Sequence, residues 1–222
     1  MIDIVIPTWP NSPQRLGYFH RTIRSMVEKL RHFPHDARFH CSSESYETDG
    51  RKWRGDALKE LCRRYGVQLY WRDWHTTSPS LGANMNAALA LATSPIVLLV
   101  QDDCPLIHPL DLSPGIELLV GDRSVDMIRY EWPPQKHRTR FVPYRDGWRQ
   151  FQLFGRFYGD RAFMVRRDFM DRHGWYAVGG VHGSSEVAMS ERLLADKAVI
   201  VAPDRQYFQH IQGLSTIPGD KR

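Results

Sequence analysis

The sequence has little of what stabilises secreted or membrane-spanning proteins. It contains only three cysteines in 222 residues, Cys41, Cys62 and Cys104, and none of them forms a CxxC pair. An odd number of widely spaced cysteines does not indicate a disulfide framework and favours a reducing compartment. The longest apolar stretch, residues 87–100, is interrupted by Thr93-Ser94-Pro95 and is too short to span a bilayer. We therefore expect a soluble, cytoplasmic protein without a signal peptide or transmembrane segment.

The glycine-rich motifs of common nucleotide-binding proteins are also absent. Neither GxGxxG nor GxxxxGK[ST] occurs, which argues against a dinucleotide site or a P-loop. There is no repeat of fixed period and no linker composition, so we expect a single domain over residues 1–222. A formal charge of +5 and a pI near 9.2 suit an anionic ligand, either a nucleotide diphosphate, a nucleic acid or a membrane surface.

The first half of the chain alternates between two kinds of apolar pattern. Short apolar runs predict strands, and apolar residues spaced at helical intervals predict the helices between them. This alternation predicts a mostly parallel sheet flanked by helices over residues 1–105. Most of the basic residues outside the apolar stripe of the first helix are assigned to a solvated face. These basic residues are Arg15, Arg21, Arg24, Lys29 and Arg31. The predicted strands are 2–7, 37–41, 67–71 and 96–100, and the predicted helices are 16–30, 51–65 and 81–92.

The second half, residues 106–222, is less regular and predicts a smaller, mixed region. Residues 133–145 are predicted as a loop, residues 150–157 as a strand or irregular segment, and residues 213–222 as a loose tail. The other predicted elements are helices at 110–119, 167–173 and 186–195, and strands at 125–131, 161–165, 198–202 and 206–210.

Two adjacent carboxylates follow the most apolar of these strands. The run Ile96 to Val100 ends in Gln101-Asp102-Asp103, and Pro105 prevents the strand from continuing. Ligands of open α/β sheets bind beyond the carboxyl ends of strands, and hard divalent cations prefer oxygen ligands. The pair therefore indicates a metal site, although aspartates also cap turns and helices. From these residues alone, both interpretations stay open.

Several segments, in this order and spacing, resemble the family 2 glycosyltransferases, which have the GT-A fold. Gln101-Asp102-Asp103 falls on the Asp-X-Asp motif of the family, with Gln101 replacing its first acid. Ser185-Glu186 falls on its acidic pair, where Asp is commoner than Glu at the second position. Ser42-Ser43-Glu44 stands in place of an acidic stretch after the second strand. The segments are Ile4 to Thr8, Gly82 to Leu89, Gln101 to Asp103, Gly159 to Val165 with the helix after it, Ser185 to Leu193, and Phe208 to Ser215.

The resemblance implies an inverting, metal-dependent transfer of a sugar from a nucleoside-diphosphate-sugar to a hydroxyl group of a glycan or other acceptor. It implies that residues 1–105 bind the donor and residues 106–222 the acceptor. Asp103 and His210 would bind Mn²⁺ or Mg²⁺, and Glu186 would be the general base. The implied donor contacts are Pro7, Thr8, Trp9, Asn11, Glu44, Arg72, Asn86 and Asp102.

Each of these roles has a plain structural alternative. His210 could instead be a surface residue with an ordinary hydrogen bond. Arg72 could instead form an ion pair with Asp73 or Glu44. Glu186 could instead be an acidic residue in the first turn of a helix, where the helix dipole favours a negative charge. Glu191 is a second candidate for the general base.

Two other functions are considered as alternatives to the glycosyltransferase. One is a basic nucleic-acid-binding module that uses Arg138, Arg140, Arg145, Arg149 and the tryptophans, although acids interrupt this set and no reader motif is present. The other is a sugar nucleotidyltransferase, which usually has a Gly-rich basic loop after the first strand. Residues 8–15 supply one Arg and no Gly. We therefore expect a transferase without a nucleic-acid partner.

Overall fold

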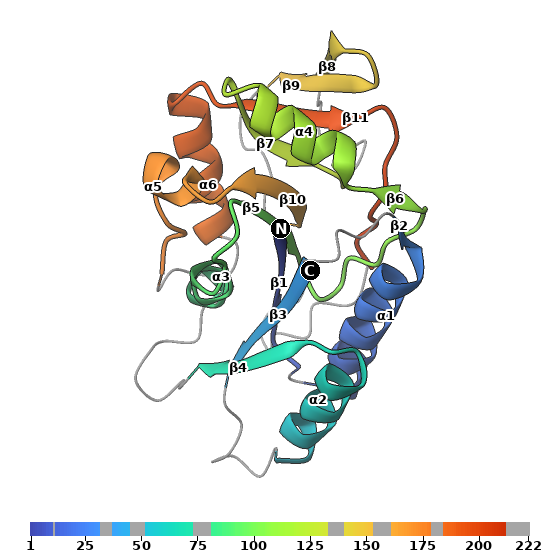
Figure 1. Ribbon diagram of the computed structural model, residues 1–222. Coiled ribbons are helices and arrows are strands. Elements are labelled where there is room, and N and C mark those ends of the chain that lie inside the picture. The colour runs from blue at the N-terminus through green and yellow to red at the C-terminus, as the bar shows by residue number, and fades with distance from the viewer. Residues whose placement is uncertain are drawn as a thin grey trace.

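A computed structural model of the protein describes residues 1–10, 12–31, 37–44, 52–72, 81–132, 140–152, 161–178 and 184–211. Within these residues, nine strands form one sheet in the order β4-β3-β1-β5-β10-β7-β11-β9-β8 (Figure 1). The prediction of a mostly parallel α/β fold is confirmed. The strands are β1 (Ile2–Thr8), β3 (Ala37–Glu44), β4 (Gln68–Arg72), β5 (Ile96–Val100), β7 (Val125–Arg129), β8 (Arg140–Arg145), β9 (Trp148–Gln152), β10 (Ala162–Arg166) and β11 (Val199–Pro203).

The strand directions bring several chain segments to one edge of the sheet. β4, β3, β1 and β5 are parallel, and β10 is inserted antiparallel between β5 and β7. β7 therefore runs in the same direction as β5, and β11 is parallel to β7. As a result, the carboxyl ends of β1, β5, β7 and β11 lie at the same edge as the start of β10. Ligand sites of such sheets lie at this edge.

Helices cover both faces of the sheet. Residues of α1 (Pro13–Lys29), α2 (Lys52–Arg64) and α4 (Ser113–Gly121) share one apolar cluster, and those of α3 (Leu81–Ala90), α5 (Phe169–His173) and α6 (Ser184–Ala195) share the other (Figure 1). Within β5, Leu98 and Val100 join the first cluster, whereas Val97 and Leu99 join the second. β5 is thus buried on both faces, which explains its uninterrupted apolar sequence.

Three predictions about the second half are wrong. The helix expected at 110–119 begins only at Ser113, because Leu110–Asp111 forms strand β6 beside β2 (Leu30–Arg31). The loop expected at 133–145 contains strand β8, which pairs with β9. The strand expected at 206–210 is reduced to a single bridge between Leu106 and Phe208. The tail expected at 213–222 lies outside the described residues.

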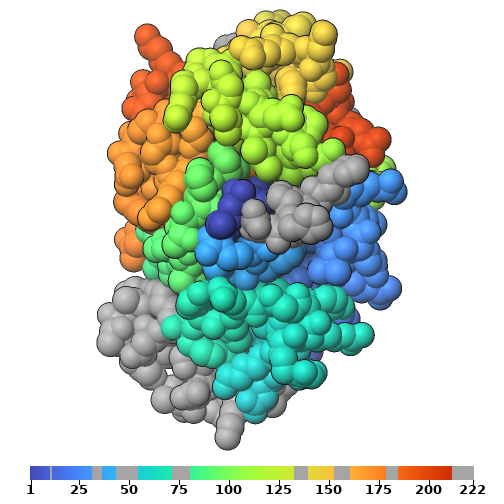
Figure 2. Space-filling model, in the orientation of Figure 1, coloured from blue at the N-terminus to red at the C-terminus, as the bar shows by residue number. Residues whose placement is uncertain are grey.

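The two halves of the chain occupy different parts of the molecule. Figure 2 shows the blue to teal segments in its lower part and the yellow to red segments in its upper part, with the green segments between them. None of the helices in the described part of the chain combines the length and apolarity needed to cross a membrane.

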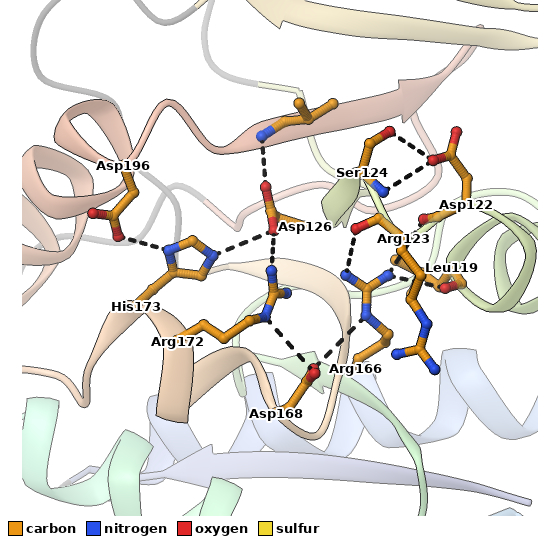
Figure 3. Close-up of polar contacts among 11 residues, drawn as sticks. Leu119, Asp122, Arg123, Ser124, Asp126, Arg166, Asp168, Arg172, His173 and Asp196 are labelled. Carbon is orange, nitrogen blue, oxygen red and sulfur yellow. Dashed lines mark hydrogen bonds and ion pairs between the residues drawn. The ribbon is translucent and has the colours of Figure 1, made fainter.

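A cluster of charged groups ties the short helix α5 to the sheet (Figure 3). His173 Nδ1 lies 2.7 Å from Asp196 Oδ2, and its Nε2 lies 3.4 Å from Asp126 Oδ1. Arg172 Nη1 donates to the same oxygen of Asp126 at 2.6 Å, and the Val199 N–H donates to the other at 2.8 Å. The hydrogen bond to Asp126 raises the pKa of His173, against the effect of burial. Protonated His173 therefore stabilises this part of the fold.

Replacement of His173 should destabilise the protein in a pH-dependent way. Because its pKa is raised in the folded state, the stabilisation is fully present below the unfolded value of about 6.5 and is lost as pH rises through the folded value. We expect His173→Gln to lower the free energy of unfolding at pH 5.5 by about 1.5 kcal/mol, the lower end for a hydrogen bond to a charged group, and by less at pH 8.5. Urea unfolding at both pH values measures the difference. The control is His108→Gln at an exposed position, and equal losses from His173→Gln at both pH values would contradict the assignment.

Candidate active site

Asp102 and Asp103 lie directly after β5 at the carboxyl edge, and only 2% and 6% of their surfaces are exposed. β1 is the parallel neighbour of β5, so its end reaches the same place. Thr8 Oγ1 donates to Asp102 Oδ2 at 2.7 Å, and the Trp9 N–H donates to the same oxygen at 3.3 Å. The structure thus brings together three of the residues predicted to contact the donor.

Arg15 joins this group from the first turn of α1, which contradicts its assignment to a solvated face. Ser12 caps the helix by accepting a hydrogen bond from the Arg15 N–H at 3.2 Å. Arg15 Nη2 then lies 2.5 Å from Asp102 Oδ1, and Nη1 lies 2.6 Å from Asp103 Oδ2. One guanidinium therefore bridges both carboxylates.

The two carboxyl groups differ in their electrostatic environment. Burial raises the pKa of Asp102 above its usual range, and the positive charge of Arg15 only partly opposes this effect. Burial also acts to raise the pKa of Asp103, but the hydrogen bond from His210 and the charge of Arg15 outweigh it, and the pKa is lowered. Asp103 is therefore the carboxylate that is held ionised, which favours it as a cation ligand.

His210 reaches Asp103 because the chain after β11 pairs with the chain after β5. The Ile107 N–H donates to Tyr207 O at 2.8 Å, the Gln209 N–H to Pro105 O at 3.2 Å, and the Ile211 N–H to Asp103 O at 2.8 Å. This register holds His210 Nε2 3.1 Å from Asp103 Oδ2. The two predicted metal ligands are therefore in contact, although they are 107 residues apart in the sequence.

The chemistry of these two side chains fits a divalent cation that shares its ligands with a substrate. Among the described residues there is no group of three or more His, Cys, Asp or Glu side chains that could hold a metal ion. Asp103 and His210 provide one oxygen and one nitrogen donor, and the guanidinium of Arg15 shows that the site accepts a positive group. Mg²⁺ and Mn²⁺ complete such sites with phosphate oxygens and water, and an imidazole ligand favours Mn²⁺.

Two asparagines of α3 connect this edge to the rest of the chain. Asn84, which sequence reasoning did not select, donates to Thr8 O at 2.9 Å and accepts from Ser42 Oγ at 3.0 Å. Asn86, a predicted donor contact, holds the backbone of Tyr176: its Nδ2 donates to the carbonyl and its Oδ1 accepts from the N–H, both at 2.9 Å. Asn86 thus fixes the segment that follows α5.

Glu186, the predicted base, lies in the first turn of α6 and is 7% exposed. The start of α6 packs against the start of α3, where Gly82 leaves no room for a side chain beside Ser185 and Ala177. Because α3 follows a parallel strand of the sheet, its N-terminus lies at the carboxyl edge. The α3 contact thus positions Glu186 at the same edge as the acidic pair.

The remaining predicted donor contacts are less fully described. Pro7 is buried within β1. Glu44 and Arg72 stand opposite each other at the ends of β3 and β4, but the positions of their side chains are not described. Asn11 lies outside the described residues.

A buried ion cluster next to Gln101 was not found from the sequence. Glu131 accepts from Arg129 Nη2 at 3.0 Å and from Arg161 Nη1 at 2.8 Å. Gln101 is joined to this cluster through its N–H, which donates to Arg161 O at 3.1 Å. These three charges come from the end of β7 and the chain before β10, and only their topology brings them together.

No family model and no curated protein matches this sequence. Solved structures do match it. They include TarS of S. aureus (14% identity, TM-score 0.63, 93% of this chain and 36% of that chain) and GalNAc-T7 with UDP, GalNAc and Mn²⁺ (12%, 0.66, 100% and 45%). A third is the mannosyltransferase PcManGT from Pyrobaculum calidifontis with GDP-Man and Mn²⁺ (14%, 0.60, 93% and 58%). This chain has the GT-A fold. It spans about a third to three fifths of these chains, and identity this low shows the fold alone.

The contact between α3 and α6 in this GT-A fold is tested by replacing Gly82. A Cβ atom there would meet the Ala177 carbonyl oxygen and lie 2.9 Å from Ser185 Cβ, so the two helices would have to separate. We expect Gly82→Ala to lower the free energy of unfolding in urea by about 1–3 kcal/mol.

Gly17→Ala is the matched control within helix α1. Its Cβ would meet no atom of the described residues within 4 Å, and the loss of glycine should leave stability unchanged or raise it by about 0.5–1 kcal/mol. Similar unfolding curves for the two variants would show that the α3–α6 contact is not as tight as described.

Proposed function

We propose that this chain is a metal-dependent glycosyltransferase that moves a sugar from a nucleoside-diphosphate-sugar to a hydroxyl acceptor with inversion. The observation that carries the proposal is the contact of Asp103 with His210 at the carboxyl edge of a GT-A fold. Two of its structural neighbours contain Mn²⁺ together with UDP or GDP-Man, and a TarS structure contains UDP-GlcNAc. These complexes support a nucleotide-sugar donor for this chain as well.

In this proposal, Asp103 and His210 hold the divalent cation, with Mn²⁺ favoured over Mg²⁺ by the imidazole ligand. When bound, such a cation offsets the negative charge that develops on the departing diphosphate. Asp102 fixes the turn after β1 through Thr8 and Trp9, so that this turn is shaped to receive the nucleoside. Pro7, Asn11, Glu44, Arg72 and Asn86 complete the proposed donor side.

Glu186 is proposed to accept the proton of the acceptor hydroxyl. The hydroxyl oxygen then forms a bond to the anomeric carbon while the bond from that carbon to the diphosphate oxygen breaks. The nucleoside diphosphate leaves with the electron pair of the broken bond. A single displacement of this kind inverts the anomeric carbon, which is the inversion proposed here.

The rival nucleic-acid function is less well supported by the charges on this chain. Arg145 and Arg149, two of the residues it would use, form ion pairs with Asp122 and Asp204. Arg138 lies outside the described residues. The three cysteines are free and buried, which agrees with the cytoplasmic location that we propose.

Asp103→Asn should abolish metal-dependent donor binding. We expect UDP or GDP to raise the melting temperature of the wild-type protein in the presence of Mn²⁺ and to raise it less without the metal. A ligand at a hundred times its Kd stabilises by about 2.7 kcal/mol, and Asp103→Asn should lose this stabilisation. Asp111→Asn, at an exposed position of β6, serves as the control. Full Mn²⁺-dependent stabilisation of Asp103→Asn would rule out the proposed site.

Glu186→Gln should lose transfer but keep donor binding. A positioned carboxylate base contributes about a hundred- to ten-thousand-fold, so release of UDP or GDP from UDP-GlcNAc or GDP-Man should slow by that factor. Glu191→Gln, at an exposed position of the same helix, should keep the wild-type rate. If Glu191→Gln loses activity and Glu186→Gln keeps it, the roles of the two residues must be exchanged.

A further inference from the structure

Arg15 is placed to offset part of the negative charge of the acidic pair. Its two Nη atoms reach Asp102 Oδ1 and Asp103 Oδ2, and one quarter of its side chain is exposed to solvent. The carboxylates themselves are almost completely buried. Two adjacent buried carboxylates without a positive partner would repel each other and lose their hydration, so a resident cation is required.

The position of Arg15 conflicts with a metal ion bound at the same time. Asp103 Oδ2 is the oxygen that faces His210, and a cation held by both side chains would use it. The same oxygen already accepts a hydrogen bond from Arg15 Nη1 at 2.6 Å. A divalent cation would therefore displace the guanidinium, or else lie beside it at a distance where two positive groups repel strongly.

Resting on the function proposed above, we propose that Arg15 is the exchangeable counter-ion of Asp102 and Asp103. In this exchange, the guanidinium leaves the carboxylates when the divalent cation and the nucleoside diphosphate bind together, and it then pairs with the diphosphate. A bidentate guanidinium suits phosphate oxygens, and the first turn of a helix favours an anion. Release of Nη2 also frees Asp102 Oδ1, which is then open to the predicted contact with the donor.

The exchange makes cation binding depend on the nucleotide. Without a diphosphate, a divalent cation must compete with a guanidinium that is tethered to the same chain and lies at 2.6 Å. With a diphosphate, the displaced guanidinium gains a new anionic partner, and the competition is removed. By linkage, the nucleotide must strengthen cation binding by the same factor by which the cation strengthens nucleotide binding.

The experiment is a titration with Mn²⁺ alone, followed by the electron paramagnetic resonance signal of the free ion. Arg15→Gln removes the charge of the competing group, so it should bind Mn²⁺ alone about ten- to hundredfold more tightly than the wild-type protein, the usual range of such coupling. With saturating Mn²⁺, the same variant should bind UDP or GDP more weakly. Arg15→Lys retains a positive charge without the fork and should lie between them.

Three controls fix the interpretation. Arg24→Gln removes an arginine from an exposed ion pair of the same helix and should match the wild-type protein. Asp103→Asn in the Arg15→Gln background should cancel the gain in Mn²⁺ affinity. If Arg15→Gln needs a cation in order to fold, recovery of its folded state by Mn²⁺ alone supports the exchange. The exchange is contradicted if Mn²⁺ does not restore the fold of Arg15→Gln and the Arg15→Lys variant does not fold either.

The outcomes separate the two proposals. If Asp103-dependent Mn²⁺ and nucleotide binding is present but Arg15→Gln leaves the affinity for Mn²⁺ alone unchanged, the exchange is wrong and the metal-dependent function stands. If neither the wild-type protein nor Arg15→Gln binds Mn²⁺ with or without UDP or GDP, the metal-dependent function itself fails, and the exchange fails with it.

Discussion

The burial of two neighbouring carboxylates at the end of β5 is the constraint on which the candidate site depends. Asp102 and Asp103 carry like charges in a place that is nearly inaccessible to water, so each needs donors from elsewhere in the chain. Asp102 obtains them from Thr8, Trp9 and Arg15, and Asp103 from Arg15 and His210. The need to satisfy two acids thus joins β1, α1 and the chain after β11 to the end of β5. The same contacts that stabilise this edge give it the shape of a ligand site.

The neighbourhood also assigns different tasks to the two acids. Asp102 accepts a hydroxyl, a backbone N–H and one arm of a guanidinium, which makes it a support for the turn after β1. Asp103 faces His210 and has a lowered pKa, so it retains its charge for a cation. Both carboxylates pair with Arg15, and their other partners are what separates the two roles.

The sequence predicted the sheet well where burial alone decides the pattern. β1, β3, β4 and β5 follow from short apolar runs. The family resemblance selected Asp103 and His210 as a pair of proposed metal ligands, and the structure shows these two side chains in contact. The hairpin of β8 and β9 was missed because its exposed strands contain Pro143 and charged residues, which resemble a loop. Arg15 was misassigned because helical periodicity describes which face meets the core but ignores the end of the helix. The first turn of α1 lies at the edge of the sheet where Asp102 and Asp103 are found, and this position is set by the topology of the fold.

The charges around the acidic pair offer a physical explanation for glutamine at position 101. It stands where the Asp-X-Asp pattern has its first acid, and its N–H is tied to Arg161, which pairs with the buried Glu131. A carboxylate at this position would be a third acid beside Asp102 and Asp103, with which Arg15 is already paired. With glutamine there, two carboxylates rather than three share the single positive charge of Arg15. In the exchange that we propose, the departure from the motif and Arg15 belong to one arrangement: fewer fixed negative charges, and an internal cation that can be exchanged.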